Sequence, residues 1–277
     1  MIQINSYEVK QETFGDGTLK CDISEIDRLL ENDALIREAI TISWEYDNDT
    51  ELFTLISLND YIIEKYPRIT RYLFMPYVPN ARQDRYVSNR LFTLKSFVKI
   101  INSLNFHKVT ICDPHSDVTT ALIDRVRIKD LDLDLYNEVF EENIIDRERF
   151  AVMFPDAGAA KKYKLPDEDW CKPTSIIIGN KHRTDEGRID SYQLLNFKEG
   201  TKFVIIRDDI CSYGGTFAAA ADELRKHGVE RIYLIVSHCE NNILKGDVLN
   251  KVDGVYTTDS IFTGEHEKIH IVKKFRR

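Results

Sequence analysis

The chain has 277 residues, of which 43% are hydrophobic and 30% charged, and its net charge is -8 at pH 7. This length predicts two domains of ordinary size, and this balance of residues is typical of folded globular proteins, which excludes a disordered chain. Nucleic acid is excluded as a favoured partner, because the net charge is negative and no basic stretch is interleaved with aromatic residues.

No segment has the length of a membrane span or the pattern of a secretory signal. The longest apolar runs, such as residues 203–206, are far shorter than the roughly 20 residues that a membrane helix needs. The first residues, Met-Ile-Gln-Ile-Asn-Ser, contain no basic stretch before an apolar core. We therefore expect a cytoplasmic protein without a membrane partner.

The five cysteines are scattered and show no Cys-x-x-Cys spacing. An odd count in a reducing compartment argues against both a disulfide framework and a zinc site. We interpret all five as small packing residues: Cys21, Cys112, Cys171, Cys211 and Cys239.

Short β-branched runs alternate with segments of helical period along the chain. We predict strands at residues 39–44, 71–76, 108–113, 150–155, 174–178, 202–207 and 231–237. Amphipathic helices are predicted at residues 50–65, 89–104 and 216–227, the last one ended by Gly228. This order predicts an α/β protein with mostly parallel sheets that are covered by helices on both faces.

The two halves of the chain have a weak internal similarity. Residues 108–113 and the helix after them resemble residues 202–209 and the helix after those, so each half is predicted to be the same α/β unit. The acidic segment 130–149 contains no clear strand and is the predicted inter-domain region. We therefore expect one domain at residues 1–134 and a second at residues 135–277.

Residues 204–216 form the strongest local pattern, an apolar strand followed by two acids, a glycine turn and an Ala-rich helix. The N–H groups of such a turn at a helix N-terminus attract an anion, and Gly214 and Gly215 let a phosphate come close. Asp208 and Asp209, at the carboxyl end of the strand, are suited to bind ribose hydroxyls or Mg²⁺. The predicted sugar-phosphate site comprises Asp208, Asp209, Ser212, Tyr213, Gly214, Gly215 and Thr216.

A second polar segment, Met-Pro-Tyr-Val-Pro-Asn-Ala-Arg-Gln-Asp-Arg at residues 75–85, follows another predicted strand. It places the guanidiniums of Arg82 and Arg85 and the amide of Gln83 together, and planar guanidiniums can bind phosphates in a bidentate manner. The pattern predicts a polyphosphate site. Neither a Gly-x-Gly-x-x-Gly element nor a P-loop is present, so the usual dinucleotide and P-loop interpretations are excluded.

These segments resemble elements of known enzymes. The glycine turn resembles the Asp-Asp-x-x-Asp-Thr-Gly-Gly-Thr element shared by type I phosphoribosyltransferases and ribose-phosphate pyrophosphokinases, and residues 75–85 resemble the ATP-binding stretch of the pyrophosphokinases. Further similar segments occur in that family's order at residues 14–17, 113–115, 155–158, 181–183 and 258–261. The resemblance covers nearly the whole chain. It implies two similar phosphoribosyltransferase-type domains, the first with the ATP-binding loop and the second with the sugar-phosphate loop.

The resemblance also implies roles for single residues. Phe14 would stack on adenine and Asp16 would bond its edge across a subunit boundary, while His115 and Asp156 would face the ATP phosphates and their Mg²⁺. The remaining ATP contacts would come from Arg82, Gln83, Asp84 and Arg85. Lys181 and Arg183 would act as catalytic cations beside His115, and residues 184–190 would form a mobile lid.

The implied reaction transfers the β,γ-pyrophosphate of MgATP to the anomeric hydroxyl of ribose 5-phosphate, in a homo-oligomer whose ATP site is shared between subunits. The general base stays open among Asp208, Asp209 and His115. The loop departs from the family pattern, because Ser212 stands where an Asp is expected and Tyr213 where a Thr is expected. Thr18 likewise replaces an expected Glu.

Three alternatives stay open, and the first follows from these departures. Some divergent, phage-type relatives use ADP-ribose as the acceptor in rebuilding NAD, and a Tyr at position 213 offers a flat ring to such an extended substrate. A phosphoribosyltransferase would not need Arg82 or Lys181. A non-catalytic regulatory subunit would be expected to lose positions such as Lys181 and Asp156, which this chain retains.

Overall fold

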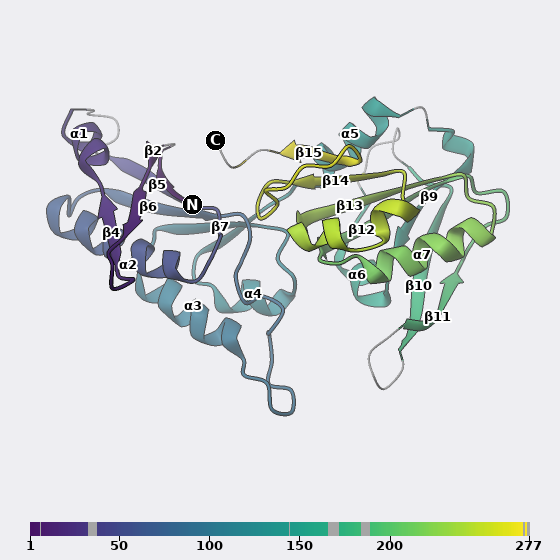
Figure 1. Cartoon of the computed structure of the whole chain (residues 1–277), viewed down its shortest axis with the longest axis horizontal. Helices are drawn as coiled ribbons and strands as arrows, with labels where there is room; N and C mark the ends of the chain where they lie inside the picture. The colour runs from purple at the N-terminus through teal and green to yellow at the C-terminus, as the bar shows by residue number, and fades with distance from the viewer. Residues whose placement is uncertain are drawn as a thin grey trace. The chain divides into compact units, whose positions relative to one another are not determined.

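The computed structural model describes residues 1–5, 7–32, 38–143, 145–165, 172–183, 189–273 and 275. The chain forms two compact units, Met1–Lys129 with Phe275–Arg277, and Asp130–Lys274. In each unit helices lie against a sheet (Figure 1). The sequence placed the division a few residues later, within helix α5 (Asp132–Glu142). This helix belongs wholly to the second unit, because it packs on the last three strands of the second sheet, β13 (Arg231–Cys239), β14 (Gly254–Thr258) and β15 (Ile269–Lys273).

The first unit contains a six-stranded sheet. Its strand order is β2 (Tyr7–Glu8), β1 (Ile2–Ile4), β5 (Ala39–Trp44), β6 (Thr70–Met75), β7 (Lys108–Cys112) and β8 (Val126–Lys129). The last four strands are parallel, and β1 and β2 are antiparallel additions at one edge. The unit also contains the hairpin of β3 (Lys10–Thr13) and β4 (Leu19–Asp22), with helices α1 (Ser24–Asn32), α2 (Thr50–Lys65), α3 (Thr93–Ser103) and α4 (Asp117–Leu122).

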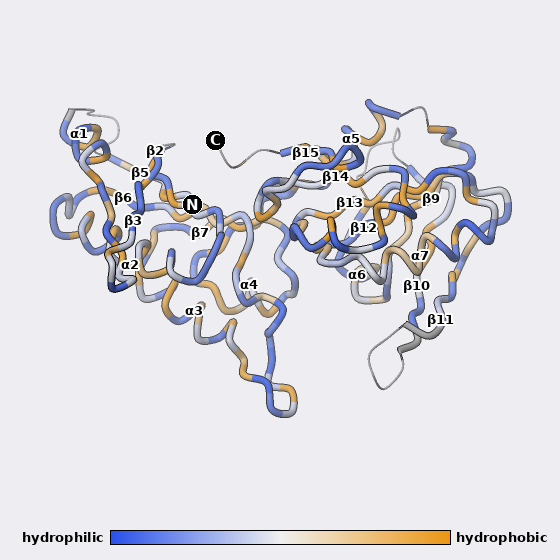
Figure 2. The backbone as a smooth tube through the Cα atoms, in the orientation of Figure 1, coloured by the Kyte–Doolittle hydropathy of each residue, from blue (hydrophilic) through white to orange (hydrophobic). Residues whose placement is uncertain are grey.

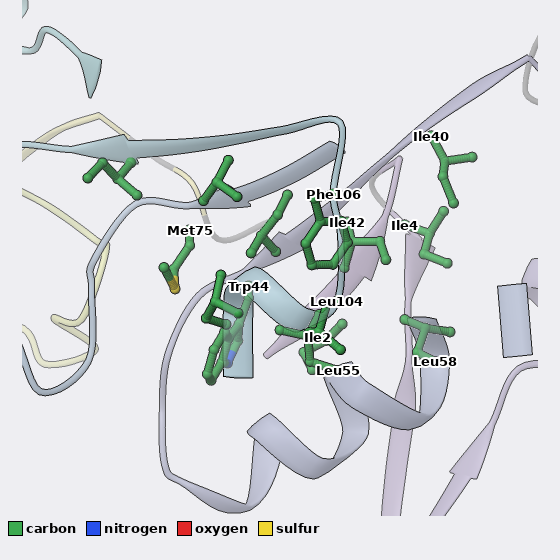
Figure 3. Packing of buried hydrophobic residues seen from close by; sticks show 14 of the residues in the cluster. Ile2, Ile4, Ile40, Ile42, Trp44, Leu55, Leu58, Met75, Leu104 and Phe106 are labelled. Atoms are coloured by element: carbon green, nitrogen blue, oxygen red, sulfur yellow. The ribbon is translucent and has the colours of Figure 1, made fainter. Parts of the chain in front are cut away.

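The core of the first unit follows from the period of its strands and helices. Strand β5 buries every second residue, Ile40, Ile42 and Trp44, as expected for a strand with one face on the core. Figure 3 shows these side chains beside Leu55 and Leu58 of α2. The indole Nε1 of Trp44 donates to a carboxylate oxygen of Glu51 at 2.9 Å, so its polar atom is satisfied inside the core. Hydrophobic and hydrophilic stretches also alternate along α3 (Figure 2).

The second unit contains a seven-stranded sheet. Its strand order is β11 (Ile189–Leu195), β10 (Ser175–Arg183), β9 (Phe150–Phe154), β12 (Phe203–Cys211), β13, β14 and β15. Only the pairing of β10 with β11 is antiparallel. The described helices are α5, α6 (Ala157–Lys162), α7 (Gly215–Lys226) and α8 (Val248–Lys251), with 3₁₀ turns at η1 (Arg147–Arg149) and η3 (Asn241–Lys245).

The predicted fold class, two α/β units with mostly parallel sheets, is confirmed. All seven predicted strands are present, and α2 has the predicted bounds. Two details differ. Helix α3 begins at Thr93 and not at residue 89, because residues 86–92 form a loop closed by a bridge between Val87 and Arg90. Strand β12 continues to Cys211, paired in register with Cys239, so Asp208 and Asp209 lie inside the strand and not after it.

The described cysteines only partly match the interpretation as packing residues. Cys112, Cys211 and Cys239 are buried, but Cys21 is exposed on the β3–β4 hairpin. Cys171 lies outside the described residues. Among the helices that the structure describes, none combines the length and the apolar character of a membrane span.

Candidate active site

Polar residues of the second unit gather where β9, β10 and β12 end. These three strands are parallel, so their carboxyl ends lie at the same edge of the sheet. Asp156 follows β9 and Lys181 lies on β10. The Nζ atom of Lys181 donates to Oδ2 of Asp156 at 2.8 Å. The other oxygen of Asp156 accepts from the backbone N–H of Ala159 at 3.0 Å and caps α6. A cation and an anion are therefore fixed together at this edge.

The ionisation of Asp156 depends on this pairing. Burial opposes the charged form, but the hydrogen bonds from Lys181 and from the N–H of Ala159 outweigh it and hold the pKa of Asp156 below its ordinary value. The preceding carbonyl, that of Pro155, accepts from the hydroxyl of Tyr192 at 2.9 Å. A side chain at Gly179 would collide with both groups, since its Cβ would lie 2.1 Å from that hydroxyl. The glycine thus permits the packing that positions Asp156.

Asp208 and Asp209 lie on β12 at the same edge. Burial, followed by the adjacent charge of Asp209, raises the pKa of Asp208 to about 8. The Asp208 carboxylate accepts from the N–H of Asp209 at 2.9 Å, and Lys162 of α6 approaches the Asp209 carboxylate at 3.9 Å. Arg207, the residue before them, is fully buried and donates to the backbone oxygen of Asp208.

The glycine turn leads from β12 into α7. Gly214 is the N-cap of α7 and has a left-handed φ of 77°, a conformation that disfavours other residues. A Cβ at Gly214 would also lie 2.4 Å from a methyl of Val248, so the position excludes side chains for two reasons. Gly215 is exposed and Thr216 partly exposed, so the first turn of the helix is open to a ligand. This is the geometry that the sequence predicted for an anion site.

Two residues of the turn differ in their surroundings. The hydroxyl of Ser212 donates to the carboxylate of Glu240 at 2.5 Å. Tyr213 is 56% exposed, so its ring is available to contact a ligand at the surface of the turn. Sequence reasoning missed Lys162 and Glu240, because each lies near the acids or the turn only through the packing of separate elements. It also gave no role to Arg207, which directly precedes the two acids on β12. The one local signal was a charged residue, Arg207, inside an otherwise apolar strand.

The predicted ATP segment of the first unit follows β6. Arg85 donates to both oxygens of the buried Asp84, at 2.7 and 3.0 Å. This bond is the main reason that the pKa of Asp84 is lowered, and the charge of His115 also contributes. The structure therefore brings Asp84, Arg85 and His115 together. Gln83 instead accepts from the hydroxyl of Thr93 at 2.9 Å and braces the start of α3.

Arg82 is exposed beside this cluster. Phe14 and Asp16 occupy the turn of the β3–β4 hairpin, and Phe14 is 54% exposed. The carboxylate of Asp16 accepts from the hydroxyl and the N–H of Thr18, at 2.7 and 3.0 Å, and these bonds lower the pKa of Asp16. Thr18, the residue that departs from the family pattern, thus stabilises the turn.

The predicted metal ligands, His115 and Asp156, belong to different units. Among the described residues, no group of three or more His, Cys, Asp or Glu side chains could by itself hold a metal ion. Mg²⁺ commonly needs only one or two protein carboxylates together with substrate phosphates and water, and the hard oxygens of Asp208 and Asp209 suit it. The residues therefore fit a Mg²⁺ ion that arrives with a nucleotide. The side chain of Arg183 and residues 184–188 of the predicted lid lie outside the described residues.

Two curated proteins show what the chain is similar to in sequence. No protein-family model matches the chain. The chain is 30% identical over 203 residues to a ribose-phosphate pyrophosphokinase of Marinomonas sp. (strain MWYL1), covering 68% of this chain and 59% of that protein. It is 26% identical over 233 residues to another of Hyphomonas neptunium (strain ATCC 15444), covering 79% of this chain and 70% of that protein.

A solved structure supports the fold. A phosphoribosylpyrophosphate synthetase from Mycobacterium smegmatis superposes with a TM-score of 0.70 and 18% identity, covering 96% of this chain and 86% of that one. The fold is thus shared over nearly the whole chain, whereas the sequence match spans less than two thirds of the length of the Marinomonas protein.

Proposed function

We propose that this chain, a divergent relative of the ribose-phosphate pyrophosphokinases, is an ATP-dependent diphosphokinase that acts on ribose 5-phosphate. The observation that carries the proposal is the meeting of three features at one sheet edge of the second unit. These are the Lys181–Asp156 pair, the acids Asp208 and Asp209, and the open glycine turn before α7. Together they offer a cation for a polyphosphate, acceptors for sugar hydroxyls and amide donors for a sugar phosphate.

In the proposed reaction, the anomeric oxygen of the sugar attacks the β-phosphorus of ATP. An O–P bond forms there as the bond between the β-phosphorus and the bridging oxygen to the α-phosphorus breaks, and AMP leaves. The products are AMP and phosphoribosyl pyrophosphate, and the proton of the hydroxyl is released. Such transfers depend mainly on positioning and on cations that neutralise the migrating oxygens, so little is required of a base among Asp208, Asp209 and His115.

The residues of the chain divide this work. The N–H groups at the start of α7 hold the 5-phosphate, and Asp208 and Asp209 orient the vicinal hydroxyls. Lys181 stabilises the charge that develops on the transferred group, and Asp156 keeps the ammonium in place until ATP competes for it. Mg²⁺ bound with the nucleotide would supply further neutralisation of the phosphates.

The nucleotide is assigned to the first unit, where Arg82 lies beside the Asp84–Arg85 cluster and His115 is close by. Both Arg82 and Arg85 are exposed, and Arg85 also binds the buried Asp84 carboxylate. We assign the phosphate contact to Arg82, because a planar guanidinium can bind a phosphate in a bidentate manner. We further propose that Phe14 and Asp16 contact the adenine of a neighbouring subunit, since both lie at the tip of a hairpin with an exposed ring. This assignment implies a homo-oligomer, and we propose that the protein is cytoplasmic.

ADP-ribose is a second candidate acceptor, because the exposed ring of Tyr213 stands at the sugar-phosphate turn. Purified protein should be incubated with MgATP and either ribose 5-phosphate or ADP-ribose, and AMP should be followed by chromatography. AMP with ribose 5-phosphate supports the main proposal, and AMP with ADP-ribose alone would replace the substrate but keep the chemistry. No AMP with either sugar would reject the diphosphokinase and favour a regulatory subunit.

A further inference from the structure

The sugar-phosphate turn rests on a second segment, residues 240–248, that follows β13. Three successive residues of the turn contact it. The hydroxyl of Ser212 bonds the carboxylate of Glu240, the carbonyl of Tyr213 fills the place where Gly246 would carry a Cβ, and Gly214 packs on Val248. The conformation of the turn is therefore set from outside the turn itself.

Glu240 is the polar part of this support. Its N–H donates to the carbonyl of Cys211 at 2.8 Å, which ties it to the last residue of β12. Its carboxylate oxygen accepts from the side-chain amide of Asn242 at 3.1 Å in addition to Ser212. Asn241, next to Glu240, in turn bonds Thr263 through its side chain at 2.7 Å. The carboxylate thus has a fixed place at the base of the turn.

The charge at this place explains the residue at position 212. The hydroxyl of Ser212 donates to the Glu240 carboxylate at 2.5 Å, so Glu240 already supplies a negative charge beside the turn. An Asp at position 212 would bring its carboxyl group into contact with that of Glu240, and two carboxyl groups that close cannot both ionise without a cost in free energy. Serine is the short donor that satisfies the glutamate.

We propose that Glu240, directly after β13, is a positioning residue of the sugar-phosphate turn, which it fixes through the hydroxyl of Ser212 and the carbonyl of Cys211. The inference rests on the proposed function for the identity of the ligand. It has a consequence for binding. Because the hydroxyl proton of Ser212 is donated to Glu240, the phosphate is held by the backbone N–H groups before α7 and by Thr216, and not by Ser212.

A double-mutant cycle tests the coupling. The variants are Ser212→Asp, Glu240→Gln and the double variant, with Ser103→Asp and Glu199→Gln as exposed controls for the same changes of charge. Binding of ribose 5-phosphate is measured by calorimetry without ATP, and Tm is measured without ligand. We expect Ser212→Asp to weaken binding by about tenfold and to lower Tm, and the double variant to return to within about threefold of the wild-type affinity.

Additive effects in the double variant, or unchanged affinity in Ser212→Asp, would overturn the proposal. Turnover assays separate it from the proposed function. If the effects of Ser212→Asp and Glu240→Gln on sugar-phosphate binding are not additive but the protein produces no AMP, the diphosphokinase is rejected and the role of Glu240 stands. In an active protein the change should fall on the KM for the sugar and leave kcat nearly unaltered, because the turn holds the 5-phosphate equally in the ground state and in the transition state. A kcat effect of the same size would contradict a positioning role.

Discussion

The guanidinium of Arg207 and the carboxylate of Asp132 form an ion pair inside the second unit, with Nη2–Oδ1 at 2.5 Å. The Arg207 side chain is 1% exposed, lies 4.1 Å over the ring of Tyr163 and also bonds the hydroxyl of Ser237. The pair joins the residue before the two acids of β12 to the first turn of α5. A buried cation therefore fixes the backbone from which Asp208 projects.

Breaking this pair should destabilise the protein. Asp132→Asn removes the negative charge that Asp132 places on the buried Arg207 guanidinium, and we expect a loss of about 2–4 kcal/mol in the free energy of unfolding, measured with urea. Asp134→Asn is the matched control, because Asp134 lies in the same turn of α5 as Asp132 and forms an exposed ion pair with Lys273 of β15. Its loss should lower the free energy of unfolding by less than about 1 kcal/mol. Equal losses in both variants would show that the buried pair has no special weight.

The second prediction concerns catalysis by Lys181. Lys181→Ala should lower kcat by about 100-fold, because the cation beside Asp156 is lost, while Tm changes little. Lys161→Ala removes an exposed lysine of α6 nearby and should keep wild-type turnover. Arg183→Ala is expected to behave like Lys181→Ala. Wild-type values of kcat in Lys181→Ala and in Arg183→Ala would refute the catalytic assignment of these two residues.

The raised pKa of Asp208 predicts how stability varies with pH. The folded carboxyl titrates at about 8 and the unfolded one near 3.8, so the folded state holds a proton that the unfolded state releases. This contribution to stability is present at low pH and is lost as the pH rises toward 8. Asp208→Asn does not titrate, so its Tm advantage over wild type should grow from pH 5 to pH 8, by the equivalent of about 1 kcal/mol or more. Asp60→Asn on α2 serves as the control, and a flat difference for Asp208→Asn would contradict the prediction.

Arg82 should matter for ATP and not for folding. We expect Arg82→Ala to raise the KM for ATP by about 10- to 100-fold with an unchanged Tm, because an exposed guanidinium is lost from the polyphosphate site. Arg90→Ala, an exposed arginine of the same loop, should leave the KM unaltered. Arg85→Ala should instead lower Tm, since it leaves the buried Asp84 carboxylate without its bidentate partner.

Tyr213 should influence the choice of acceptor. If its exposed ring stacks on an extended substrate, Tyr213→Thr will shift the ratio of kcat/KM values from ADP-ribose toward ribose 5-phosphate, by about tenfold. The ratio is measured from AMP release with each sugar. An unchanged ratio would remove the ring from the specificity of the site.

Local patterns in the sequence were sufficient for much of this protein. The alternation in β5 and the amphipathic period of α2 depend on neighbours in the chain, so both elements could be predicted with their bounds. The same holds for Gly214 and Gly215, because a turn between a strand and a helix is a local structure with a local glycine requirement.

Other relationships arose only from the tertiary structure. Glu240 lies 28 residues from Ser212 in the chain, and Asp132 lies 75 residues from Arg207. Glu240 reaches Ser212 because β13 lies beside β12 in the sheet, and Asp132 reaches Arg207 because α5 packs on the sheet, an arrangement that no local pattern specifies. Hydrophobic periodicity determines which face of a strand is buried. The packing of the whole unit decides which strands are neighbours, and therefore which charged side chains meet at the end of the sheet.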